Sequence, residues 1–126
     1  MRSGLAAAAL ALALGLATPA VAEGVIGMDA VKAGLDSGRI ILVAVREPDE
    51  FAAGHVPGAI NLPMSTFSPS VLPRAGDKTV VVMCRSGRRA GQAQAIAASA
   101  GRRDIVDYAG SMIEWTAKGG PVTTGK

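Results

Sequence analysis

Residues 79–101, TVVVMCRSGRRAGQAQAIAASAG, carry the clearest structural pattern in this chain of 126 residues. The apolar run at residues 80–83 predicts a short buried strand, bounded by a polar start and a loop. Residues 90–100 are rich in Ala and Gln, which predicts a helix that ends at Gly101. The only cysteine of the chain, Cys84, lies between the two elements, at the point where the strand stops.

The loop after this cysteine predicts an anion-binding site. It consists of Arg85, Ser86, Gly87, Arg88 and Arg89. A loop that enters a helix N-terminus directs backbone N–H groups into one small space, and the helix dipole adds partial positive charge. Gly87 permits the sharp turn of an anion-binding nest. In such surroundings the pKa of a cysteine falls from about 8.5 to roughly 3.5–7.5. We therefore expect Cys84 to be a nucleophile in an oxyanion cradle.

The alternative is a buried, inert thiol at the end of a core strand, which is the commoner situation for a lone cysteine. The residues after Cys84 favour the functional interpretation, because a core position is not normally followed by Arg-Ser-Gly-Arg-Arg.

Residues 1–22 have the pattern of a cleavable secretory signal peptide. Arg2 provides a positive start, residues 5–17 are an almost pure Ala/Leu run, and residues 20–22 (Ala-Val-Ala) precede the expected cleavage point. The apolar run is shorter than the about 20 residues that span a membrane. An uncleaved anchor and a buried helix are the alternative interpretations of this segment, and both are less favoured than a signal peptide. We expect export to the periplasm, or to the exterior if the host lacks an outer membrane, with no stable membrane insertion after cleavage.

Cleavage would leave residues 23–126, enough for one small domain and hardly for two. The formal net charge of +3 falls by one, to +2, without Arg2. This charge is too small to indicate a nucleic-acid partner, and no stripe of aromatic and basic residues supports one. One cysteine forms no internal disulfide, and one cysteine with one histidine makes no structural zinc site. We expect neither a metal nor a cofactor.

Strand and helix patterns alternate along the expected mature chain. The predicted strands are a short edge strand at 25–26 and further strands at 40–45, 59–62, 80–83 and 105–108. The predicted helices are 29–35, 48–53, 90–100 and 111–117, with a loop or broken helix at 63–78 and a Gly-rich tail at 118–126. This alternation implies a parallel sheet with helices on both faces. Ligands of such sheets bind at the carboxyl ends of the strands, where Cys84 lies.

Four segments of the chain match one family in order and spacing. They are residues 45–51 (VREPDEF), 54–61 (GHVPGAIN), 84–89 (CRSGRR), and Trp115 with residues 119–122 (GGPV). From about residue 28 to residue 122, the chain thereby resembles the single-domain, thiosulfate sulfurtransferase-like rhodaneses. The resemblance implies a three-layer rhodanese-like α/β fold, with a central parallel sheet of about five strands and helices on both faces.

The resemblance also implies sulfurtransferase chemistry. The thiolate of Cys84 would attack the outer sulfur of thiosulfate or a similar anionic donor, release sulfite and hold a persulfide. A nucleophilic acceptor, cyanide or a thiol, would then remove that sulfur, so catalysis is covalent and proceeds in two steps. The implied substrate-binding residues are Arg85, Ser86, Gly87, Arg88 and Arg89. Their amides would cradle the persulfide or the departing anion. Arg89 matches the arginine that closes the family's loop. Arg85 and Arg88 would recruit the donor, although each alone is explained nearly as well as a solvated loop charge.

Other matching residues are interpreted as structural. His55 belongs to a structural signature of the family and Trp115 to the core. Arg46 and Glu47 are expected to support the site or to pair with each other. The chain departs from the family at Ala44, where an Asp is usual, and at Gly110-Ser111, where two glycines are frequent.

Two alternative functions remain. Phosphatases with a related loop place five residues between Cys and Arg, whereas four lie between Cys84 and Arg89, so phosphatase activity is disfavoured. The stronger alternative is a persulfide carrier or binding module that serves one protein of a sulfur relay. The intact cysteine loop argues against a purely docking role and does not separate a carrier from an enzyme.

Overall fold

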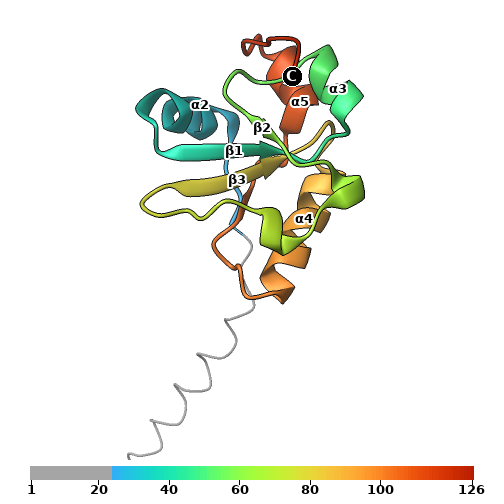
Figure 1. Cartoon of the computed structure of the whole chain (residues 1–126). Coiled ribbons are helices and arrows are strands. Elements are labelled where there is room, and N and C mark those ends of the chain that lie inside the picture. The colour runs from blue at the N-terminus through green and yellow to red at the C-terminus, as the bar shows by residue number, and fades with distance from the viewer. Residues whose placement is uncertain (1–23) are drawn as a thin grey trace, which may run out of the picture.

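The computed structural model describes residues 24–126 (Figure 1). The expected signal peptide at residues 1–22 lies outside the described residues. Within the part of the chain that is described, no helix has the length and apolarity needed to span a membrane.

A parallel sheet forms the centre of the fold. Its strands are β1 (Ile40–Ala44), β2 (Ile60–Asn61), β3 (Thr79–Met83) and β4 (Val106–Asp107), in the order β2-β1-β3-β4. β1 and β3 pair along their whole length, from Ile40 with Thr79 to Ala44 with Met83. The predicted edge strand at 25–26 is reduced to a single parallel bridge between Val25 and Asp107. The sheet therefore has four named strands, and this bridge occupies the place of the fifth.

Helices cover both faces of the sheet (Figure 1). They are α2 (Met28–Ser37), α3 (Pro48–Ala53), α4 (Arg88–Ser99) and α5 (Ser111–Ala117). Successive strand residues point to opposite faces, so Leu42 and Ala44 of β1 join the apolar cluster with α2, α3 and α5, whereas Val43 joins the cluster with α4. Cys84 belongs to the α4 cluster. The predicted three-layer arrangement is confirmed.

The predicted elements match the observed ones to within a few residues. α3 and α5 have the predicted bounds, and α4 begins two residues earlier than predicted, at Arg88. Residues 63–78 contain two short 3₁₀ turns, η2 (Met64–Thr66) and η3 (Pro69–Val71), which agrees with the predicted broken helix. The Gly-rich tail is tied to the domain, because Thr123 and His55 exchange backbone hydrogen bonds of 2.8 Å in each direction.

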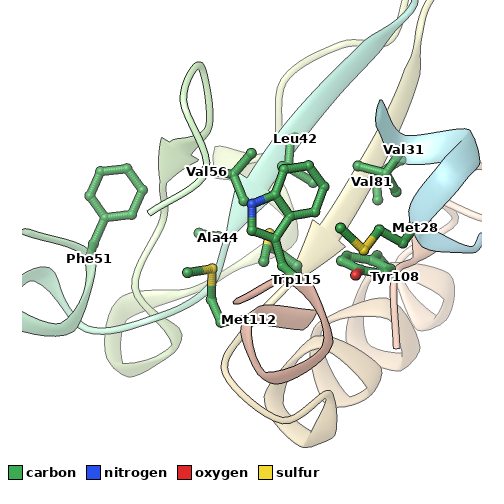
Figure 2. Packing of buried hydrophobic residues seen from close by; sticks show 11 residues of the cluster. Met28, Val31, Leu42, Ala44, Phe51, Val56, Val81, Tyr108, Met112 and Trp115 are labelled. Carbon is green, nitrogen blue, oxygen red and sulfur yellow. The ribbon is translucent and has the colours of Figure 1, made fainter. Parts of the chain in front are cut away.

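Trp115 is the centre of the cluster that packs α5 onto the sheet (Figure 2). Its side chain is 1% exposed, and the indole N–H donates to the carbonyl of Pro121 at 2.8 Å. The ring of Tyr108 meets it edge to face, with centroids 6.4 Å apart. A side chain at Gly120 would collide with the indole, which explains why the tail has glycine beside this tryptophan. Trp115 is therefore a packing residue, as predicted.

Candidate active site

Cys84 directly follows β3 and lies beneath the N-terminus of α4. Its side chain is fully buried, and its thiol is free. The backbone N–H of Gly87 donates to its sulfur, Sγ, at 3.0 Å, and that of Ala90 donates at 3.4 Å. The sulfur thus lies against inward-facing amides of the loop and of the first helical turn.

The start of α4 explains why the amides face the sulfur. The first four N–H groups of a helix have no partner within the helix, and α4 has no side-chain cap and no acidic residue in its first turn. Gly87, at the N-cap, has a φ of 100°, and a side chain there would collide with the carbonyl of Ala109. The sulfur of Cys84 takes the place of the missing cap. The amide of Ala90 was missed by the sequence analysis, which started the helix two residues too late.

Ser111, the first residue of α5, is a second contact of Cys84 that sequence reasoning missed. Its hydroxyl accepts the backbone N–H of Cys84 at 3.0 Å and donates to the carbonyl of Tyr108 at 2.9 Å. The same oxygen lies 4.0 Å from the sulfur of Cys84. The signal available in the sequence was the departure from two glycines at Gly110-Ser111.

A cavity of about 210 Å³ opens beside the loop. Its lining combines two guanidinium groups with apolar and hydroxyl side chains of α5: Arg46, Arg85, Met112, Ile113 and Thr116. Arg46 is 8% exposed, and it donates to the carbonyls of Gly54 at 2.6 Å and Glu50 at 3.1 Å. Burial is the main cause that lowers the pKa of Arg46 from its usual value. The cavity presents positive charge close to Cys84 and suits an anionic ligand.

Arg89 forms a partly exposed ion pair with Glu50, a residue that the sequence analysis did not single out. The guanidinium donates to both carboxylate oxygens, at 2.6 and 3.1 Å. These hydrogen bonds are the main cause that lowers the pKa of Glu50 to about 2, and they raise the pKa of Arg89. The ion pair thereby joins the start of α4, where the loop ends, to α3. The side chains of Ser86 and Arg88, in contrast, are exposed.

Residues 28–118 match the Rhodanese-like domain family. The chain belongs to the rhodanese family. An uncharacterised Synechocystis relative is 41% identical over 87 residues, which are 69% of this chain and 49% of that protein. The thiosulfate:glutathione sulfurtransferase of Homo sapiens is 35% identical over 98 residues, 67% of this chain and 85% of that enzyme. This rhodanese therefore spans about half of the first relative and most of the second.

A solved structure agrees with this assignment. The human single-domain sulfurtransferase TSTD1 superposes with a TM-score of 0.65 at 32% identity, covering 75% of this chain and 96% of that one. The rhodanese-like α/β fold expected from the sequence is thereby confirmed, and the chain has relatives that are sulfurtransferases.

Arg46 and Glu47 of the rhodanese motif before α3 do not pair with each other, although such a pair was one of the two arrangements expected from the sequence. The carboxylate of Glu47 instead accepts the hydroxyl of Ser65 at 2.6 Å and its N–H at 3.1 Å, and it caps α3. His55 stacks on the ring of Phe51 at 3.7 Å, and its Nδ1 bonds the Phe51 carbonyl at 2.8 Å. These contacts support the structural interpretation of His55.

Removing the charge of Glu50 should loosen the loop after Cys84. It should also lower the free energy of unfolding and change how that free energy depends on pH in acid. We expect Glu50→Gln to lower the free energy of unfolding at neutral pH by about 1 kcal/mol, since the pair is partly exposed. In the wild type this stabilisation is complete above the ordinary carboxyl pKa of 4.5 and is lost as the pH falls towards about 2, because the folded-state pKa is depressed. Denaturant unfolding at a series of pH values across that window measures the difference.

The matched control is Asp104→Asn, which removes one charge from the exposed Arg102–Asp104 pair. It should leave sulfur transfer unchanged, whereas Glu50→Gln should slow it. Stability curves of Glu50→Gln and wild type that stay parallel down to about pH 2 would contradict the assigned role of the pair.

Proposed function

We propose that this rhodanese is a sulfurtransferase that moves a sulfane sulfur from thiosulfate, or a similar anionic donor, to cyanide or a thiol. The observation that carries the proposal is the position of the only cysteine sulfur, which accepts N–H groups from Gly87 and Ala90 at the start of α4. Such donors stabilise negative charge on sulfur, so Cys84 is suited to act as the nucleophile and persulfide carrier.

The proposed reaction has two half-reactions. In loading, the Cys84 thiolate attacks the outer sulfur of thiosulfate, a new S–S bond forms, and the old S–S bond breaks with its electron pair leaving on sulfite. In discharge, the acceptor attacks the outer sulfur of the persulfide, and the electron pair of the S–S bond returns to Sγ. No oxidant or reductant is required beyond the donor and the acceptor.

The charge around the loop supports an anionic donor. Arg46 and Arg85 line the cavity beside the loop, and the side chain of Arg88 is exposed. Arg89 is engaged with Glu50, so we assign it to loop closure rather than to direct recruitment of the donor. Because Cys84 is fully buried, we infer that the loop or its neighbours move to admit the donor.

The direct test is the intact mass of the protein after treatment with thiosulfate. We expect a gain of one sulfur atom that cyanide reverses. The chain has only one cysteine, so the added sulfur is assigned to Cys84 without a mapping step. No gain at any pH would overturn the proposal.

The burial of Cys84 also favours a second candidate, a dedicated persulfide carrier whose loop is opened by one protein of a sulfur relay. A thiosulfate–cyanide assay separates the two. Sustained turnover supports the enzyme, whereas formation of the persulfide without turnover supports the carrier.

We propose a periplasmic location, on the pattern of residues 1–22 alone, with neither a nucleic-acid partner nor stable membrane insertion of the mature chain. The intact mass of protein recovered from a periplasmic fraction tests this, since it should correspond to a chain that begins at Glu23.

A further inference from the structure

Ser111 occupies a backbone conformation that its residue type disfavours. It is fully buried with a φ of 51°, and it is the only non-glycine residue with a positive φ in the described part of the chain. A Cβ crowds the backbone in this left-handed region, where glycine is the ordinary choice. A serine here requires compensating contacts, and those contacts involve the hydroxyl.

The hydroxyl of Ser111 has two alternative acceptors for one proton. It already accepts the N–H of Cys84 at 3.0 Å. Its own proton can go to the carbonyl of Tyr108, 2.9 Å away, or towards the sulfur of Cys84, 4.0 Å away. A serine hydroxyl carries a single proton that rotates to suit its surroundings, so the two donations exclude each other.

The charge on Cys84 differs between the two states of the proposed reaction. In the free thiolate the negative charge is on Sγ, whereas in the persulfide it is on the outer sulfur. We propose that Ser111 turns its proton towards Sγ when charge develops there, and returns it to Tyr108 when Cys84 carries the persulfide. This inference rests on the proposed sulfurtransferase function and assigns Ser111 a part in the discharge step.

The contact should act on the two half-reactions unequally. During discharge, Sγ is the leaving group, and a more stabilised thiolate leaves faster. During loading, the same stabilisation makes each thiolate a weaker nucleophile. A donor that follows the developing charge therefore favours discharge relative to loading, because it stabilises the transition state of discharge more than the persulfide.

Two variants separate the hydroxyl from the backbone strain. Ser111→Gly and Ser111→Ala both remove the hydroxyl, and only glycine also relieves the strained φ. Loading with thiosulfate and discharge to cyanide are measured in separate single-turnover experiments. The pH is chosen so that the rate of alkylation of Cys84 no longer rises with pH in any variant, which means that all variants are compared with the thiol ionised. We expect discharge to slow by roughly three- to tenfold relative to loading in both variants, while Ser111→Gly unfolds at a higher temperature than Ser111→Ala.

The outcomes are distinguishable. If the ratio of the discharge rate to the loading rate in Ser111→Gly equals that of the wild type, whether or not both rates have fallen, Ser111 has only a structural role. The inference is then wrong, although the proposed function stands. If the wild type takes up no sulfur from thiosulfate, the proposed function and the inference both fail.

Discussion

Cys84→Ser should abolish sulfur transfer while leaving the fold intact. A serine hydroxyl stays protonated at neutral pH and is a poor nucleophile towards sulfur, so we expect turnover with thiosulfate and cyanide to fall at least about a thousandfold. In the wild type, the N–H groups of Gly87 and Ala90 donate to the sulfur at 3.0 and 3.4 Å. The smaller serine oxygen can still accept hydrogen bonds from them. The thermal midpoint should therefore change little, and the variant should gain no sulfur in an intact-mass measurement.

Ser86→Ala provides a control within the same loop, because its side chain is exposed and its removal leaves Cys84 unchanged. It should keep wild-type persulfide formation. Turnover by Cys84→Ser at a rate comparable to that of Ser86→Ala would refute a cysteine-based mechanism.

Gly87→Ala should disrupt the loop itself. The φ of 100° at Gly87 is unfavourable for a residue with a side chain, at roughly 1–2 kcal/mol, and the added methyl group would collide with the carbonyl of Ala109. We expect a loss of more than about 2 kcal/mol in the free energy of unfolding. Relief of the collision requires the backbone at Gly87 to move, which would disturb the hydrogen bond from its amide to Cys84. A displacement of about 1 Å in such a site lowers the rate on the order of a hundredfold.

Gly101→Ala is the matched control for this substitution. Gly101 has a φ of 92°, and a side chain there meets nothing within 4 Å. It should therefore lose stability from the backbone term alone and retain full activity, assayed well below both unfolding temperatures. Wild-type turnover in Gly87→Ala would show that the geometry of this amide does not matter to the reaction.

The elements nearest Cys84 were predictable because their signals are local. The chain runs without interruption through a strand of five residues, a cysteine, a glycine-containing turn and an Ala-rich helix. The pattern of apolar and turn residues identifies each of them. The helix was predicted to start at Ala90 because Arg88 and Arg89 were assigned to the loop, whereas α4 starts at Arg88. Two arginines in a first turn are unfavourable beside the positive end of the helix dipole. They are accommodated because the amides turn towards the cysteine sulfur and because Glu50 compensates one of the charges.

The residues that complete the site come from distant segments and carried no local signal. Glu50 pairs with Arg89 across 39 positions of sequence, and Ser111 contacts Cys84 across 27. For Arg46 and Glu47, two neighbours in sequence, the expectation was that they support the site or pair with each other. Adjacent side chains often point in different directions, and here one reaches the cavity while the other reaches Ser65.

The pattern of residues along the chain was enough to show that strands alternate with helices and that the only thiol lies where a strand end runs into a helix N-terminus. The side chains that surround this thiol became known only from the packing of the folded chain. The sheet order β2-β1-β3-β4 places the carboxyl ends of β1, β3 and β4 next to one another, so the segments that follow them converge at one edge of the sheet. The order and register of parallel strands depend on packing between distant segments, which the local pattern of each segment does not encode.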